Sequence, residues 1–270
     1  MAFTRKNLIY ATGLFWLTAQ LYCAFQPVDA MLMRAILLSC SLAIAFLAKP
    51  FSGTSNRYIN IIIDTSGYFI SIGVLLYIAL NTTRLSSRIP YVDEIFSLDI
   101  ALCILYVILI FETGRRYLGW SMNVVCLIFL VYGFFGANLP SIFTHSGIDL
   151  HVFTEVQFLT TGGIFSSPIA TTVSTVYYFM IFGGFLAATP AGTLFASCAK
   201  YLTRNSLGGA GKATVISAGL FGMISGSGPG NTATVGALML PMMNEAKFSP
   251  KFSAALFAVG GTGGLLIPPV

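Results

Sequence analysis

Charged side chains are scarce in this sequence. Only 9% of its 270 residues are Asp, Glu, Lys or Arg, whereas soluble domains carry about 25%. So few charges cannot cover a water-facing surface, and the 56% hydrophobic content excludes intrinsic disorder. Cysteine pairs with Cys-x-x-Cys spacing are also missing, which argues against a disulfide scaffold. We expect the five cysteines to be small buried apolar residues: Cys23, Cys40, Cys103, Cys126 and Cys198.

The apolar residues gather in long blocks rather than in short amphipathic stripes. We predict about six membrane-spanning helices, each long enough to cross about 30 Å of hydrocarbon at 1.5 Å per residue. They occupy residues 8–25, 31–48, 58–80, 95–111, 119–139 and 170–188. The predicted fold is therefore an all-α polytopic membrane protein embedded in the lipid bilayer.

The basic residues are distributed unevenly between the loops. If the N-terminus lies in the cytoplasm, 11 of the 14 Lys and Arg residues fall on the inner side, and only Arg34, Arg84 and Arg88 on the outer side. The positive-inside rule thus predicts a cytoplasmic N-terminus. This topology explains the net charge of +5, and no basic stripe with interleaved aromatic residues indicates nucleic-acid binding.

Two carboxylates, Asp64 and Asp99, fall inside predicted spans. An ionisable residue inside a membrane is a functional candidate by default. Each of the two lies near an end of its span, however, so we favour interfacial carboxylates that pair with water, Arg57 or Arg88.

After residue 188 the long blocks give way to shorter pieces. Residues 191–204 mix apolar and basic side chains, and we expect an interfacial helix there. Two apolar pieces come next, 213–224 and 232–243, each reaching about 18 Å as a helix. Between them lies the helix-breaking stretch Ser225-Gly226-Ser227-Gly228-Pro229-Gly230-Asn231. We therefore predict a re-entrant helical hairpin, with its tip near the membrane midplane.

A second interruption occurs at 260–264, where glycines separate the apolar pieces 252–259 and 265–269. This pattern predicts a broken helix, and broken helices mark the binding sites of transporters, since their carbonyl ends hold cations and their N–H ends hold anions. Glycine-rich stretches also serve close helix packing. A non-transporting membrane scaffold or assembly partner is therefore the alternative. No catalytic arrangement of side chains is visible, so we do not expect an enzyme.

Several of these motifs resemble the large permease subunit of tripartite ATP-independent periplasmic (TRAP) transporters. They are Gly222-Met223-Ile224-Ser225-Gly226-Ser227, Asn231, Gly236, Leu240-Pro241-Met242-Met243, Phe248-Ser249-Pro250 and the run 261–269. Residues 115–120 are similar to the junction in fused permeases that pair with TAXI-type binding proteins. The resemblance implies a small-subunit-like four-helix region at 1–111 and the N-terminal half of the transport domain at 112–270.

The resemblance further implies secondary active transport across the bacterial inner membrane. A periplasmic TAXI-type binding protein would deliver a small organic anion, such as a carboxylate, and an ion gradient would drive its uptake. The implied ion site comprises Ser225, Ser227 and Asn231, with backbone carbonyls around Gly261, Gly263 and Ile267. Residues facing the substrate would be Gly228, Gly230, Thr232 and Thr262.

The implied coupling ion is sodium. The proton is the open alternative, because Pro229 and Gly230 differ from the residues most common at these positions in the TAXI-type family. The family's transport domain has a second hairpin and a second broken helix, whereas this sequence stops at Val270. We therefore expect a fragment, or a separate chain that supplies the missing C-terminal half.

Overall fold

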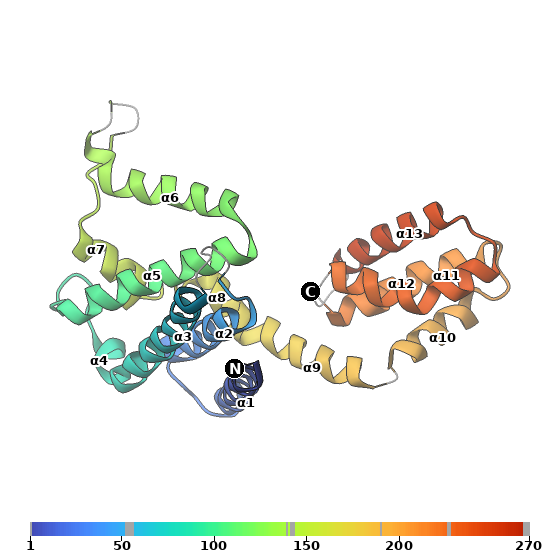
Figure 1. The fold of residues 1–270 in the computed structure, drawn as a ribbon, viewed down its shortest axis with the longest axis horizontal. Helices are drawn as coiled ribbons and strands as arrows, with labels where there is room; N and C mark the ends of the chain where they lie inside the picture. Colours follow the sequence, from blue (N-terminus) through green and yellow to red (C-terminus); the bar gives the residue numbers. More distant parts are fainter. Residues whose placement is uncertain are drawn as a thin grey trace. The chain divides into compact units, whose positions relative to one another are not determined.

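The computed structural model describes residues 2–51, 57–138, 140, 144–189, 191–225 and 228–266. Within these ranges the chain is helical and contains no strand, as the sequence predicts. It divides into two compact units, unit 1 (Met1–Val173) and unit 2 (Ser174–Val270), which are described separately (Figure 1). The domain boundary at residues 111 and 112 stays a prediction.

Four helices of unit 1 are long and apolar enough to cross a membrane. They are α1 (Ala2–Phe25), α2 (Ala30–Ala48), α3 (Arg57–Leu80) and α5 (Ser97–Tyr117). They confirm the first four predicted spans, although α1 begins earlier and α5 ends later than predicted. The extension of α5 is possible because Glu112 lies one helical turn before Arg115 and Arg116 and accepts hydrogen bonds from both.

The fifth predicted span is a shorter helix, α6 (Trp120–Phe135), of 16 residues. It begins after Gly119, whose φ of 85° lies in the left-handed region that suits glycine. The 3₁₀ turn η1 (Gly136–Asn138) comes directly after it. The sixth predicted span is helical but irregular, since the π-helix η3 (Thr172–Val176) separates α8 (Ser167–Thr171) from α9 (Tyr177–Ala188). Beyond the four long helices, the number of spans stays a prediction.

Three short elements lie between these helices of unit 1: α4 (Thr82–Ser87), α7 (Leu150–Thr154) and the π-helix η2 (Glu155–Leu159). The core of the unit is built around α2, whose neighbours include α1, α3 and α5. Phe46, Tyr106, Phe158 and Phe165 are almost fully buried there. The Tyr106 hydroxyl hydrogen-bonds with Ser39 Oγ over 2.9 Å, so its polar group is satisfied inside the core.

The two carboxylates inside the spans are paired, as predicted for interfacial carboxylates, and Asp99 pairs with an arginine other than the expected Arg88. Asp64 accepts from Arg5 Nη2 at 2.5 Å and from Arg116 Nη1 at 2.7 Å. The side chain of Arg57, its predicted partner, lies outside the described atoms. Asp99 pairs with Arg84 at 2.7 Å instead of Arg88. The described partners of Asp64 come from α1 and α5, which helix packing brings next to α3, and the sequence prediction did not include them.

These ion pairs lie at opposite ends of the four long helices. The start of α1, the end of α2, the start of α3 and the end of α5 meet around Asp64, where Arg116 also donates to the Lys49 carbonyl. At the other end, Arg84 donates to Asp99 and to the Tyr77 hydroxyl. The hydrogen bond to Asp99 raises the pKa of the Arg84 guanidinium above its ordinary value. The four helices therefore run in alternating directions.

Of the cysteines, Cys23, Cys40 and Cys103 are buried as predicted, whereas Cys126 and Cys198 are exposed on their units. The prediction was wrong for these two because α6 buries none of its residues within unit 1 and Cys198 lies on an outward face of unit 2. The exposed residues around Cys126 are apolar, so burial against the protein itself is not needed for Cys126 in a lipid environment.

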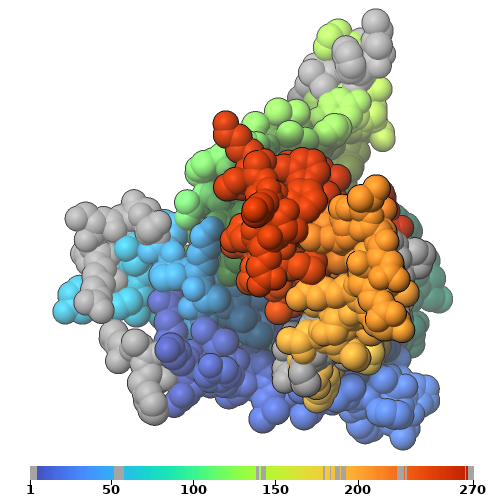
Figure 2. Space-filling model, turned by 90° about the vertical axis from the view of Figure 1, so that its right-hand side faces the viewer, coloured from blue at the N-terminus to red at the C-terminus, as the bar shows by residue number. Residues whose placement is uncertain are grey.

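Unit 2 is a small bundle of helices. After α9 it contains α10 (Ala191–Thr203), α11 (Gly209–Ser225), α12 (Gly228–Glu245), α13 (Pro250–Gly263) and the 3₁₀ turn η4 (Gly264–Leu266). The α11 helix packs against α10, α12 and α13, and the orange and red segments of Figures 1 and 2 show this close packing. The interface is built largely from small residues and methionines: Ala196, Ala199, Ala213, Ala218, Met239 and Met243.

Candidate functional site

The predicted hairpin corresponds to α11 and α12, which pack side by side in unit 2. Its two helices contain 17 and 18 residues, or about 26 Å and about 27 Å at 1.5 Å per residue. Both are longer than the predicted half-length pieces, since α11 begins at Gly209 and the stretch from Gly228 to Asn231 forms the first turn of α12 rather than a loop. Proline is tolerated there, since the first N–H groups of a helix have no intrahelical acceptor. The described helices thus correct the predicted loop, and the re-entrant insertion stays a prediction.

The predicted break at 260–264 is also largely helical. The α13 helix continues through Gly263, and the change to 3₁₀ geometry occurs at Gly264. Glycine disfavours a helix by only about 1 kcal/mol relative to alanine, so packing against α11 and α12 overrides its local preference. Residues 267–270 lie outside the described part of the chain.

Asn231 joins the three helices of this site. Its side chain is 1% exposed, and Nδ2 donates to the carbonyl oxygens of Ala218 at 2.8 Å and Gly261 at 3.1 Å. Ala218 belongs to α11 and Gly261 to the last turn of α13, where helix carbonyls lack intrahelical partners. The two acceptors fix the orientation of the amide, because a flipped Asn231 would place its oxygen against both carbonyls.

The amide oxygen of Asn231 takes no part in these two hydrogen bonds. Oδ1 is buried and has no hydrogen-bond partner among the described residues. A buried polar atom without a partner is costly and calls for an explanation, such as a bound ion or water. Oδ1 is therefore the described atom of this site most suited to a cation.

Glycines allow the three helices to approach Asn231. A Cβ atom at Gly261 would collide with Thr232, and one at Gly264 would collide with Asn231 Nδ2, the Ala218 carbonyl and Gly222. At Gly263, by contrast, a Cβ atom would meet nothing within 4 Å. Part of the glycine pattern thus serves close packing, which the sequence left open as an alternative role.

The remaining predicted site residues are distributed unevenly. Thr232 Oγ1 donates to the Gly228 carbonyl at 2.9 Å and approaches the Phe257 carbonyl at 3.4 Å, so Thr232 lies beside α13 with Asn231 and Gly261. Thr262 is exposed and donates to Ala258 of its own helix at 2.5 Å. Gly228 is buried, and Gly230 is exposed.

Three predicted residues cannot be placed in the site from side-chain contacts. Ser225 ends α11, and its side chain is not described. Ser227 and Ile267 lie outside the described residues. The sequence reasoning missed Ala218 because a backbone acceptor in the middle of a helix has no signature in the residue type.

The site lies in a charge-free part of unit 2. Residues 213–244 and 252–270 contain no Asp, Glu, Lys or Arg. The electrostatic field there comes from helix ends instead: the N-terminus of α12 carries a partial positive charge and the C-terminus of α13 a partial negative one. Such ends can bind an anion and a cation, respectively.

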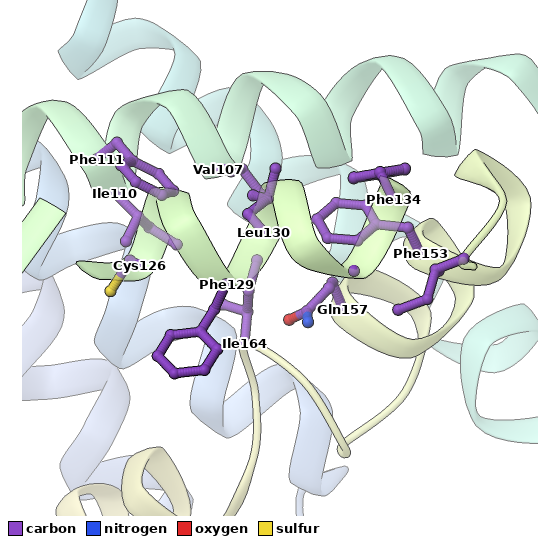
Figure 3. A pocket seen from close by; sticks show the side chains of 12 residues that line it. Val107, Ile110, Phe111, Cys126, Phe129, Leu130, Phe134, Phe153, Gln157 and Ile164 are labelled. Atoms are coloured by element: carbon purple, nitrogen blue, oxygen red, sulfur yellow. The ribbon is translucent and has the colours of Figure 1, made fainter. Parts of the chain in front are cut away.

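A cavity of about 450 Å³ in unit 1 offers a contrast to this site (Figure 3). It lies between α5, α6 and the segment 148–164, and its lining is apolar apart from Gln157 and Cys126. A cavity with one amide and one thiol has few groups to orient a polar ligand. The described residues that line this cavity therefore do not indicate a binding site for a transported ion or anion.

Comparison with known proteins places this stretch of the chain within a recognised family. A model of the tripartite ATP-independent periplasmic transporter DctM component matches residues 105–270, which include all of α11, α12 and α13. No solved structure matches the chain.

Individual relatives agree with this match. The C4-dicarboxylate TRAP transporter large permease protein DctM of Rhodobacter capsulatus is 31% identical over 97 residues, covering 36% of this chain and 22% of that protein. The isethionate TRAP transporter permease protein DctMQ of Oleidesulfovibrio alaskensis is 32% identical over 105 residues, covering 39% of this chain and 16% of that protein. The 2,3-diketo-L-gulonate TRAP transporter large permease protein YiaN of Escherichia coli is 32% identical over 92 residues, covering 34% of this chain and 22% of that protein.

The shared stretches thus span less than a quarter of each of these relatives. The family model, in contrast, covers more than half of this chain. This chain belongs to the DctM component family of tripartite ATP-independent periplasmic transporters.

Proposed function

We propose that this chain is a permease component of a secondary active uptake system, in which a sodium gradient drives the import of a small organic anion such as a carboxylate. The observation that carries the proposal is Oδ1 of Asn231, which is buried at the junction of α11, α12 and α13 and has no hydrogen-bond partner in the described part of the chain. This junction lies in the stretch matched by the family model.

The donor set fits a hard monovalent cation. Sodium prefers oxygen ligands, and the charge-free junction offers an amide oxygen and the carbonyls of the last turn of α13. Asn231 Oδ1 would be one ligand, and carbonyls around Gly261, Gly263 and Ile267 with the hydroxyls of Ser225 and Ser227 would complete the set. Nδ2 of Asn231 has a positioning role, because its bonds to Ala218 and Gly261 hold Oδ1 in place.

The anion would be recognised at the start of α12. Gly228, Gly230, Thr232 and Thr262 are the proposed contacts, supported by the positive end of the α12 dipole. The printed names of the three relatives refer to C4-dicarboxylate, isethionate and 2,3-diketo-L-gulonate, all of them anions. Two of these anions are carboxylates and isethionate is a sulfonate, so the names and this helix end together favour a small organic anion, such as a carboxylate.

The setting of the chain is also proposed. An inner-membrane location with a cytoplasmic N-terminus is supported by the biased loop charges and by the meeting of Arg5, Lys49 and Arg116 at one end of unit 1. A periplasmic TAXI-type binding protein is the proposed donor of the substrate. A C-terminal half of the transport domain, from the same or another polypeptide, is proposed as well, since the relatives are much longer than the shared stretch.

The test is uptake into proteoliposomes by the complete permease that contains this chain. A panel of labelled small carboxylates is offered with and without the binding protein, under inward sodium, inward proton or no gradient. We expect uptake of at least one carboxylate that requires both the binding protein and the sodium gradient. Uptake driven by the proton gradient alone would contradict the assigned ion, and uptake that ignores the binding protein would contradict the assigned system.

The second candidate function is a membrane scaffold, and the collisions that a Cβ atom would meet at Gly222, Gly261 and Gly264 show that some glycines do serve packing, here within unit 2. Under this hypothesis the glycines serve packing alone. Alanine at Gly226 and Gly228 would then disrupt assembly with other membrane subunits while leaving sodium-dependent uptake intact. Loss of uptake with assembly preserved would reject the scaffold.

A further inference from the structure

A groove of about 390 Å³ runs between α5 and α6 of unit 1. Because α6 turns back along α5 after Gly119, the end of α5 and the start of α6 lie at the same end of this groove (Figure 1). Glu112, Arg115, Trp120 and Asn123 line that end, and apolar side chains line the rest. The groove is therefore polar at one end and apolar along its remaining length.

A hydrogen bond joins the two helices close to the polar end. Nδ2 of Asn123 on α6 donates to the Phe111 carbonyl of α5 at 2.6 Å. Gly114 allows this approach, because a Cβ atom there would lie 2.6 Å from Asn123 Oδ1. Since α6 buries none of its residues within unit 1, the apolar walls that it contributes to the groove stay uncovered by the rest of the unit.

The dimensions of the groove match one leaflet of a bilayer. At 1.5 Å per residue, the wall of α5 extends about 12 Å from Arg115 to Val107, and the wall of α6 extends about 15 Å from Trp120 to Leu130. Half of a hydrocarbon core of about 30 Å is about 15 Å. Trp120 is 67% exposed at the polar end, and tryptophan is enriched where lipid headgroups meet the hydrocarbon. The polar end therefore suits a headgroup, and the apolar length suits an acyl chain.

The width of the groove is too small for a helix. A volume of about 390 Å³ over about 15 Å gives a mean cross-section of about 26 Å². A helix about 10 Å across has a cross-section of about 80 Å², three times as large. An extended hydrocarbon chain is the apolar group that fits.

The polar end carries a net positive charge. Ion pairs link Arg5 with Asp64, Asp64 with Arg116, Arg116 with Glu112, and Glu112 with Arg115. This row contains three arginines and two carboxylates, and it begins and ends with an arginine. Glu112 is shared between two guanidinium groups, so it does not neutralise Arg115 completely. An anion is therefore attracted to this end, and a cation is repelled.

Arg115 ends the row at the wall of the groove. Its Nε and Nη2 donate to Glu112 at 2.9 Å, whereas the accessible Nη1 has no hydrogen-bond partner among the described residues. The ring centroids of Phe51 and Trp120 lie 5.0 and 5.9 Å from Cζ, within the range of cation–π contacts. These contacts hold the guanidinium in place and leave Nη1 as a donor for an anion.

We propose that the groove binds an anionic phospholipid, whose phosphate accepts a hydrogen bond from Arg115 Nη1. One acyl chain lies along the groove against Val124, Leu127 and Leu130. A zwitterionic lipid places a cationic group beside the row of arginines and binds less tightly. In the proposed orientation this lipid belongs to the cytoplasmic leaflet, where basic residues attract anionic lipids. The site uses unit 1 alone, so it does not depend on the sodium site or on the transported anion.

The fluorescence of Trp120 reports on the occupant of the groove. The chain has two tryptophans, Trp16 and Trp120, so Trp16→Phe leaves only the one at the groove. This variant is reconstituted in phosphatidylcholine nanodiscs that contain increasing fractions of either phosphatidylglycerol or phosphatidylcholine with dibrominated acyl chains, because bromine quenches a tryptophan that it contacts. We expect phosphatidylglycerol to bind beside Trp120 about fivefold more tightly than phosphatidylcholine, the effect of one basic residue near an anionic lipid.

Two variants in the Trp16→Phe background test the assigned contacts. Arg115→Gln removes the donor, while Arg116 keeps its ion pair with Glu112. This variant should reduce the preference for phosphatidylglycerol to less than about twofold. Val124→Phe narrows the groove at an exposed residue and should lower quenching by both brominated lipids.

Lys6→Gln is the matched control, because Lys6 is an exposed base near the same end of unit 1 that does not line the groove. It should leave the preference for phosphatidylglycerol unchanged. Equal quenching by the two brominated lipids in the Trp16→Phe chain would overturn the proposal. An equal loss of preference in Lys6→Gln and Arg115→Gln would do so too, since it indicates only a diffuse surface potential. Quenching by neither lipid would also overturn it, because a protein segment then covers Trp120.

Discussion

Replacing Asp64 with leucine removes the carboxylate that holds the ends of four helices together. Asp64 and Arg116 are 4% and 3% exposed at their side chains, and their atoms are 2.7 Å apart. Removing one partner of a buried pair costs about 3–5 kcal/mol when the other charge is left unpaired, but Arg116 keeps its ion pair with Glu112 at 2.7 Å. Arg5 is 30% exposed, so its ion pair with Asp64 contributes at most about 1 kcal/mol to the free energy of unfolding. We therefore expect Asp64→Leu to lower the free energy of unfolding of unit 1 by about 3 kcal/mol, the lower end of that range.

The assay is reversible unfolding of the chain in mixed micelles, followed by circular dichroism, for Asp64→Leu, Arg116→Met and the double variant. The double variant should recover about 2 kcal/mol of the summed losses, because no unpaired charge remains. Asp149→Leu, at an exposed carboxylate without a side-chain cap, should change stability by less than about 0.5 kcal/mol. Strictly additive losses in the double variant would refute the coupling of Asp64 with Arg116.

Two further predictions concern packing. Gly261→Ala should destabilise unit 2 by about 1–3 kcal/mol, because its Cβ would collide with Thr232. Gly263→Ala, whose Cβ would meet nothing within 4 Å, should stabilise α13 by about 0.5–1 kcal/mol. Equal effects of the two variants in an unfolding titration would contradict the close approach of α12 to Gly261. Tyr106→Phe should cost unit 1 about 1 kcal/mol through loss of the buried bond to Ser39, and no change in the unfolding midpoint would show that this bond contributes nothing.

The sequence predicts those features of the fold that depend on local composition. The spans α1, α2, α3 and α5 follow from long apolar blocks, because a helix in a bilayer must satisfy its own backbone. Positions within unit 2 were harder to predict. Gly228 to Asn231 and Gly260 to Gly263 contain helix-disfavouring residues, yet both stretches are helical where the structure describes them. Packing between helices outweighed the local preference of about 1 kcal/mol per glycine.

Partners distant in the sequence could not be read from any local pattern. Asp64 and Arg116 are separated by 52 residues, and Asn231 lies 30 residues before Gly261. The sequence singled out Asn231 and Gly261 by their residue types, but it contained no sign that the Asn231 amide would also reach the Ala218 carbonyl. The ion pair of Arg88 with Glu155 was missed for the same reason, because the two residues come from the loop after α4 and from η2.

The central claim is that Asn231 Oδ1 binds the coupling ion, and sodium-dependent stabilisation of the chain tests it most directly. The melting temperature is measured in detergent with sodium chloride replaced stepwise by choline chloride at constant ionic strength. A ligand at 100 times its dissociation constant stabilises the folded state by about 2.7 kcal/mol. We expect this stabilisation in the unmodified chain and in Asn244→Ala, an exposed asparagine at the far end of α12. Asn231→Ala should abolish it, and retention of the full sodium response in Asn231→Ala would contradict the account.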